Sequence, residues 1–210
     1  MKRRTKAVVV AALAALWAGA VWAADPDADE MAAKGKAYFE QRFTDLGGVA
    51  EKRPTAETFR EAMAPVAEGT PGFFGGTLID TNFVIREVYY KRDFLARGFD
   101  LKKVRQLDGF WALMRKAPAP QLSEPGHGNI VQPRLIAMRY PVLVDGKLEN
   151  IVSMMVRTEK FLEATGLDRC KAFRITCLGQ PAEEKGTLSG SPHEVKLDLP
   201  STDWVIQYDR

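Results

Sequence analysis

Two long runs with strand character, residues 135–144 and 148–157, follow each other near the middle of the second half of the chain. The connection between them contains Asp145 and Gly146. An Asp-Gly pair between two apolar runs is the strongest short-range signal for a β-hairpin. The two runs therefore predict antiparallel strands joined by a tight turn, and the rest of the fold has to accommodate this hairpin in an antiparallel sheet.

Helix and strand signals surround this hairpin in a simple order. Further strands are expected at residues 73–79, 83–90, 171–178, 194–199 and 204–208. Helices are expected at residues 31–44, from residue 54 to residue 68, at 93–116 and at 159–165. Gly47 and Gly48 should end the first helix, while Thr158 should cap the last one and Gly166 should end it. The Pro- and Gly-rich segment 117–128 should be a loop.

Hairpin-connected strands with separate helices predict an α+β fold. We expect a mostly antiparallel sheet with a long N-terminal helix and covering helices. The chain has 210 residues, of which 46% are hydrophobic and 27% charged, and this composition is that of an ordinary folded domain. No linker looks long enough to separate two domains, so a single domain over residues 24–210 is expected.

The first 23 residues have the layout of a secretory signal peptide. Basic residues lie at positions 2, 3, 4 and 6, an uncharged run follows, and Val21, Trp22 and Ala23 form a small-x-small cleavage site. The alternative is an uncleaved membrane anchor, because the uncharged run 7–24 is nearly long enough to span a bilayer. The run is mostly Ala and contains only two Leu, so its tendency to insert is weak. We therefore favour cleavage and a periplasmic or secreted protein.

Cleavage would also change the charge of the protein. The whole chain has 30 basic and 27 acidic residues and a net charge of +3. Loss of residues 1–23 leaves 26 basic and 27 acidic residues, a net charge of −1. A nearly neutral protein lacks the basic surface that nucleic acids require, so no nucleic-acid partner is expected.

Sequence motifs for catalysis and cofactor binding are absent. The Gly-rich stretch 72–76 lacks the GxGxxG spacing and precedes a strand, whereas a phosphate-binding loop precedes a helix. His127 and His193 are expected in separate loops, and neither has an acidic partner at the spacing of metal ligands apart from Glu194, which is adjacent to His193. We therefore expect no enzyme activity, no cofactor and no metal site.

The two cysteines, Cys170 and Cys177, flank or end a predicted strand. An exported protein favours disulfide formation. However, seven residues of extended strand separate two Cα atoms by roughly 23 Å, whereas a disulfide tolerates about 4.4–6.8 Å. The strand therefore predicts two free thiols, and a disulfide would require this segment to fold back on itself.

Two passages resemble the Cache-type family of sensor domains. Residues 72–85 read GFFGGTLIDTNFVI and are similar to the opening strand, turn and second strand of that family. Residues 139–152 read RYPVLVDGKLENIV and are similar to its central hairpin, in which a Pro-Val strand runs through an Asp-Gly-Lys turn into the next strand. The export signal and the long N-terminal helix agree with the same family.

The resemblance implies a PAS-like extracytoplasmic module with a ligand pocket on one face of its sheet. Such modules are commonly the input of receptors in chemotaxis and two-component signalling. Typical members continue into a transmembrane helix and a cytoplasmic output, whereas this chain ends at Arg210 just after its last predicted strand. The expectation is a sensor domain without its own output module, which relays ligand occupancy to a membrane partner. The family's amino-acid-binding signature is not recognisable, so the sequence leaves the ligand open.

The candidate ligand-binding residues are polar or large side chains on one face of a predicted hairpin strand or on the covering helix: Trp111, Arg134, Tyr140, Ser153, Met155 and Arg157. The two arginines suit a carboxylate through bidentate hydrogen bonds, so an organic anion is a candidate ligand. The alternatives are structural. Trp111 would then be a core residue, and the aliphatic part of Arg157 would cover the end of its strand.

Two hypotheses of different classes remain at this point. The first is an exported small-molecule sensor that acts with a membrane receptor. The second is a structural or interaction module that forms a homodimer through its N-terminal helix and binds no ligand. Stabilisation by small molecules distinguishes them, because a ligand that binds the folded state raises its stability.

Overall fold

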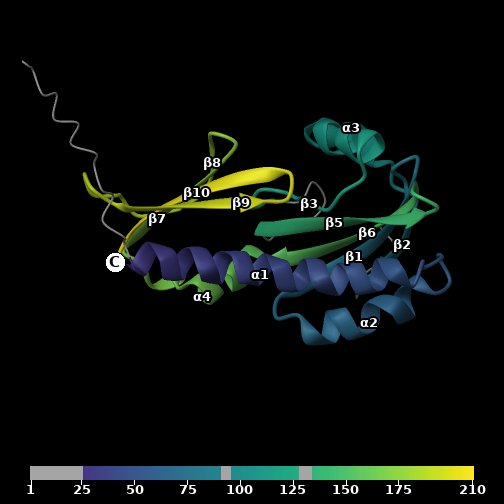
Figure 1. Ribbon diagram of the computed structural model, residues 1–210, viewed down its shortest axis with the longest axis horizontal. Helices are drawn as coiled ribbons and strands as arrows, with labels where there is room; N and C mark the ends of the chain where they lie inside the picture. Colours follow the sequence, from purple (N-terminus) through teal and green to yellow (C-terminus); the bar gives the residue numbers. More distant parts are fainter. Residues whose placement is uncertain (1–25, 91–95, 128–133) are drawn as a thin grey trace, which may run out of the picture.

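The computed structural model describes residues 26–90, 96–127 and 134–210. The expected signal peptide therefore lies outside the described residues. Within them, the strands form two antiparallel sheets that lie next to each other along one long helix, α1 (Pro26–Glu51), as Figure 1 shows. The predicted α+β class, with a long N-terminal helix and covering helices, is confirmed, and the strands are divided between two sheets.

The larger sheet has the strand order β2-β1-β6-β5-β3, and β4 also pairs with β5. Its strands are β1 (Phe73–Asp80), β2 (Ile85–Tyr89), β3 (Gln121–Leu122), β4 (Gly126–His127), β5 (Arg134–Val144) and β6 (Lys147–Arg157). The smaller sheet has the order β8-β7-β10-β9. Its strands are β7 (Ala172–Cys177), β8 (Gln180–Lys185), β9 (His193–Leu199) and β10 (Thr202–Asp209).

Helices cover both faces of the larger sheet (Figure 1). Helix α1 and helix α2 (Phe59–Gly69) lie on one side, while helix α3 (Asp108–Lys116) lies on the opposite side. Helix α4 (Thr158–Thr165) follows β6 and packs against α1. Short 3₁₀ turns in the described part of the chain occupy Leu101–Lys103, Arg105–Leu107 and Leu167–Arg169.

Each side of the larger sheet has its own hydrophobic cluster. The larger cluster includes Phe39, Met154 and Trp204, and it joins α1 to both sheets. The smaller cluster includes Phe83, Trp111 and Ile151, and it lies on the α3 side of the larger sheet. The two faces of this sheet therefore have separate packing environments.

The first helix does not end at Gly47 and Gly48, as the sequence predicted, but continues through them to Glu51. A glycine inside a helix costs about 1 kcal/mol relative to alanine. Here, tertiary packing outweighs that cost, because the part of α1 that contains Gly47 packs against β5. A Cβ on Gly47 would lie 3.4 Å from the Cζ atom of Tyr140.

Within the described part of the segment expected to be helical at residues 93–116, only α3 and the two preceding 3₁₀ turns are helical. Residues 91–95 lie outside the described residues. Gly98 has a left-handed φ of 82°, which a continuous α-helix does not allow. Asp100 then accepts a hydrogen bond from the backbone N–H of Lys102 and starts a 3₁₀ turn. The prediction of one long helix here was wrong.

Smaller differences between the predicted and the observed elements concern loops and helix caps. The expected loop at residues 117–128 contains the two-residue strands β3 and β4, and residue 128 lies outside the described part. The edge strand β8 was not predicted, because its sequence, QPAEEK, has no apolar alternation. Thr158 does not cap α4, whose N-cap is Arg157 without a side-chain cap. Gly166 ends α4 with a φ of 82°, as predicted.

The prediction of two free thiols is confirmed. Cys170 and Cys177 are both buried and unbonded; Cys170 precedes strand β7, and Cys177 is the last residue of that strand. Among residues 26–90, 96–127 and 134–210, no helix has the length and apolar content needed to cross a membrane.

Candidate functional site

The register between β5 and β6 determines which hairpin residues share a face. Arg139 lies directly opposite Ser153, Ala137 opposite Met155, and Tyr140 opposite Val152. Residues that lie directly opposite each other in antiparallel strands project to the same side of a sheet. Ser153 and Met155 therefore share their face with Arg139, whereas Tyr140 lies on the other face.

A β-bulge causes this arrangement. Leu143 pairs with Leu148 and Val142 pairs with Asn150, so the register shifts by one residue between Val142 and Leu143. A shift of one residue moves every side chain beyond it to the opposite face relative to its partner strand. Without the bulge, Arg134 and Tyr140 would have shared a face with the candidate residues of β6.

The assignment of Arg134 and Tyr140 to the same site as Ser153 is therefore corrected. Tyr140 lies next to Gly47 of α1. Arg134 binds the second sheet, where its guanidinium donates to the carboxylate of Glu183 and to the carbonyl of Ala182. Neither side chain belongs to the face that carries Arg139.

Arg139 is the most unusual residue on the α3 face. Only 6% of it is exposed, and its Nη1 atom is buried without a hydrogen-bond partner among the described residues. Its Cζ atom lies 4.9 Å from the ring centroid of Phe110 and 5.3 Å from that of Trp111. Burial lowers the pKa of Arg139 to about 10, and the charge of Glu124 opposes this shift. The guanidinium therefore remains positively charged at neutral pH.

Gln121 of β3 lies directly opposite Arg139. It is 2% exposed, and its amide nitrogen donates to the backbone carbonyl of Phe110 over 3.0 Å. Its Oε1 atom is buried and has no hydrogen-bond partner in the described part of the chain. A buried donor and a buried acceptor, each without a partner, thus lie on neighbouring strands beneath α3.

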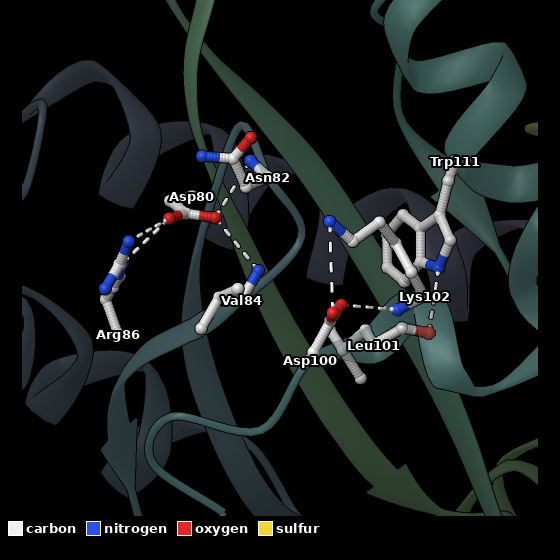
Figure 2. Close-up of polar contacts among 8 residues, drawn as sticks. All are labelled: Asp80, Asn82, Val84, Arg86, Asp100, Leu101, Lys102 and Trp111. Carbon is white, nitrogen blue, oxygen red and sulfur yellow. Dashed lines mark hydrogen bonds and ion pairs between the residues drawn. The ribbon is translucent and has the colours of Figure 1, made fainter.

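The segment that precedes α3 contacts Trp111. The indole Nε1 donates to the carbonyl of Leu101 over 3.4 Å (Figure 2). The indole also stacks on Phe83, with ring centroids 4.6 Å apart. Leu101 in turn donates its backbone N–H to the carbonyl of Phe83 over 2.9 Å. Trp111 is therefore attached to the turn between β1 and β2.

Asp80 organises that turn (Figure 2). Its Oδ1 atom accepts hydrogen bonds from the backbone N–H groups of Asn82 and Val84, each over 2.9 Å. Its Oδ2 atom pairs with the Arg86 guanidinium over 2.5 Å. Burial alone would raise the pKa of Asp80, but the Val84 N–H and the Arg86 guanidinium outweigh burial and lower the pKa.

The remaining candidate residues lie on β6, on the same face as Arg139. Ser153 is buried, while Met155 and Arg157 are half-buried. The Cζ atom of Arg157 lies 5.5 Å from the ring centroid of Phe74, and Phe74 stacks on Tyr90 with centroids 4.9 Å apart. Of the six residues proposed from the sequence, the structure thus places four on the α3 face: Trp111, Ser153, Met155 and Arg157.

Arg139 and Gln121 were missed at the sequence level. Arg139 belongs to a strand whose other members are mostly apolar, and a charged residue in such a strand is a signal for a functional group. Gln121 lies in a segment expected to be a loop, so nothing in its surroundings marked it. Metal-ligating side chains offer no site: the described ranges contain no cluster of three or more His, Cys, Asp or Glu residues. The side chain of His127 lies outside the described part, and His193 stacks on Tyr208.

This chain matches known proteins in its fold and not in its sequence. No family model and no curated protein matches the sequence. An extracellular ligand-binding receptor from Desulfohalobium retbaense is similar in structure, with a TM-score of 0.69 and 13% identity over 87% of this chain. The chain spans only 39% of that receptor.

Two chemoreceptor domains are similar over nearly their whole length. The ligand-binding domain of PctC from Pseudomonas aeruginosa, solved with GABA, has a TM-score of 0.65 and 14% identity, over 87% of this chain and 95% of that domain. The corresponding domain of CtaA from Pseudomonas fluorescens, solved with L-alanine, has a TM-score of 0.64 and 13% identity, over 88% of this chain and 96% of that domain. The chain therefore has the fold of the Cache-type sensor domains, which its residues 72–85 and 139–152 resemble in sequence.

Proposed function

We propose that this protein is an exported sensor domain that binds a small molecule on the α3 face of its larger sheet. The observation that carries this proposal is the buried guanidinium of Arg139, whose Nη1 atom has no partner among the described residues. An unpaired buried charge costs several kcal/mol. Ligand pockets combine an apolar lining with a few convergent polar groups, and a site of that kind accounts for this cost.

The lining proposed for this site comes from four elements. Trp111 and Phe110 of α3 supply apolar area, and Ser153 and Met155 of β6 lie on the sheet face that α3 covers. Arg157 lies at the end of the same face, beside Phe74. We retain Trp111, Ser153, Met155 and Arg157 as binding residues and add Arg139 and Gln121.

Export is part of the proposal. It is supported by the signal-peptide layout of residues 1–23 and by the extracellular or receptor origin of structurally similar domains. We further propose that the protein relays ligand occupancy to a membrane receptor. Chemical crosslinking of intact cells, with and without ligand, tests this relay, and a crosslinked membrane protein whose yield changes with ligand supports it.

A thermal-shift screen of the exported protein tests binding. Organic acids, amines and amino acids are the compounds to screen, and a saturable rise in Tm identifies a ligand, since stability increases with RT ln(1 + [L]/Kd). Arg157→Ala should weaken binding of an anionic ligand about 10- to 100-fold, as expected for loss of a charged hydrogen bond. Arg174→Ala is the matched control, because Arg174 lies in an exposed ion pair on the smaller sheet.

Failure of the whole screen would contradict the sensor proposal. The hypothesis of an interaction module that dimerises through α1 would then remain, and sedimentation measurements over a range of protein concentrations would test it. A monomer that binds no compound would exclude both hypotheses.

A further inference from the structure

We infer that the ligand is a small hydroxycarboxylate, bound through its carboxylate by Arg139 and through its hydroxyl by Gln121. This inference rests on the proposed function and names its ligand class. It follows from the hydrogen-bonding groups that lie unused beneath α3, and from the charges that surround them.

The first step concerns charge. The Nη1 atom of Arg139 is a buried donor without a hydrogen-bond partner in the described ranges, and no described ion pair joins this guanidinium to a carboxylate. Guanidinium groups bind carboxylates with short, charge-assisted hydrogen bonds. An anion beneath α3 would therefore use the donor and also compensate the buried charge. A neutral ligand would leave that charge unpaired.

The second step concerns the acceptor. Gln121 already uses its amide nitrogen, which donates to the Phe110 carbonyl, so the amide orientation leaves Oε1 as the unused group. This oxygen accepts hydrogen bonds only, so the ligand has to supply a donor. Directly opposed residues of antiparallel strands have Cα atoms about 4.5–5.5 Å apart. One small molecule can therefore reach both Arg139 and Gln121 if its donor lies close to its carboxylate.

The third step decides between a hydroxyl and an ammonium donor. In the part of the chain that the structure describes, the residues paired with Arg139 or in contact with its guanidinium are neutral: Gln121, Ser153, Phe110 and Trp111. The carboxylate that acts on Arg139 is that of Glu124, and Glu124 is exposed. An ammonium group in this site would place a second positive charge next to the guanidinium without a buried counter-charge. A hydroxyl group avoids that cost.

Matched ligand pairs test this inference by calorimetric titration of the exported protein. L-Lactate and L-alanine differ only in their donor, and 2-hydroxyisocaproate and leucine form a second pair with a larger side chain. We expect the hydroxy acid to bind at least about tenfold more tightly in one pair or both. Lactamide lacks the negative charge of the carboxylate, and propionate lacks the hydroxyl donor. Each should bind more weakly than lactate, and loss of the charge should have the larger effect.

Two variants test whether Gln121 and Arg139 bind the ligand. Gln121→Glu places a carboxylate opposite Arg139, so it should raise the Tm of the ligand-free protein and weaken hydroxy-acid binding about 10- to 100-fold. Arg139→Lys keeps the charge but loses the two-pronged geometry, and it should bind the same acid more weakly while remaining folded. Arg174→Gln, on the smaller sheet, should change neither property.

The outcomes separate this inference from the proposed function. Tighter binding of amino acids than of hydroxy acids, or unchanged hydroxy-acid binding by Gln121→Glu, would overturn the inferred ligand class and leave the sensor proposal intact. Absence of binding by every compound in both the matched pairs and the wider screen would overturn both.

Discussion

Arg134 at the start of β5 and Glu183 in β8 form an ion pair that links the two sheets. The guanidinium of Arg134 also donates to the carbonyl of Ala182 in the same edge strand. A second link lies further along, where the backbone N–H of Leu122 donates to the carbonyl of Pro200 over 3.1 Å. The strand that carries Arg139 is therefore connected directly to the smaller sheet.

Replacement of Arg134 should weaken the association of the two sheets. Arg134→Ala removes the ion pair and the bond to Ala182, and we expect the free energy of unfolding to fall by about 1 kcal/mol, because the guanidinium is partly exposed. Arg174→Ala breaks an ion pair whose two side chains are 47% and 63% exposed, and it should change stability by less than about 0.5 kcal/mol. Urea denaturation of both variants measures the difference. Equal effects would show that the Arg134 pair contributes no more to stability than the exposed pair of Arg174.

Asp80 should stabilise the turn that holds Trp111. Asp80→Asn loses the ion pair with Arg86 and weakens two backbone hydrogen bonds, so we expect a loss of about 1–2 kcal/mol at pH 7. The pKa of this carboxyl is lowered from its ordinary value of 3.8, so its contribution is present above that pH and is lost as the pH falls through the folded-state pKa. Denaturation at pH 7 and at lower pH values should therefore show a difference between the two proteins that shrinks with acid. A constant difference would mean that the charge of Asp80 is not the cause.

The thiols of Cys170 and Cys177 should be unreactive in the folded protein. Burial raises both pKa values, that of Cys177 to about 12, so neither thiol forms much thiolate near neutral pH. Without reductant, iodoacetamide should modify neither cysteine in the folded protein and both cysteines in the unfolded protein. Since the folded pKa of Cys177 exceeds the ordinary value of 9.0, its contribution to stability should fall as the pH rises above that value. A mass two hydrogens below the reduced value, without labelling, would reveal a disulfide and contradict the structure.

The β5–β6 hairpin, strands β1, β2, β7, β9 and β10 and helices α2 and α4 were predictable, because they depend on local periodicity and turn residues. The Asp145-Gly146 signal placed β5 and β6 to within one residue of their bounds. The length of α1 was not predictable, because its passage through Gly47 depends on packing against Tyr140, far away in the sequence. The same holds for β8, which is polar and joins its sheet only through pairing with β7.

The candidate site depended on one structural feature that alternation does not encode. Residues of each hairpin strand were assigned to the correct alternating sets, but the bulge between Val142 and Leu143 decides which set of β5 faces which set of β6. This single shift moved Arg139 into the site and Tyr140 out of it. A β-bulge is a local departure from regular pairing, and the extra residue of this bulge, Glu149 of β6, is not a glycine that would have marked it.

Export should leave an N-terminus near Ala24. The basic residues at positions 2–6, the uncharged run and the small residues before Ala24 are the features that a signal peptidase requires. Mass spectrometry of the protein isolated from its native cell envelope measures the terminus. An intact Met1 would contradict cleavage and support the alternative of a membrane anchor.

The fluorescence of Trp111 should report on ligand binding. The chain has four tryptophans, and loss of residues 1–23 leaves only Trp111 and Trp204. Trp111 lies 5.3 Å from the guanidinium of Arg139, whereas Trp204 is fully buried in the larger hydrophobic cluster. A ligand that binds Arg139 changes the electrostatic field at Trp111 and should therefore change its emission.

Two variants, each with one tryptophan left after cleavage, separate the emission of Trp111 from that of Trp204. In Trp111→Phe the emission change on addition of the tightest-binding hydroxy acid should disappear, and its affinity should fall by about two- to fivefold, since phenylalanine binds cations more weakly than tryptophan. In Trp204→Phe the change should persist, provided that circular dichroism shows the fold to be retained. Persistence of the full emission change in Trp111→Phe would place the ligand away from α3, because Trp204 lies in the cluster on the opposite face of the sheet.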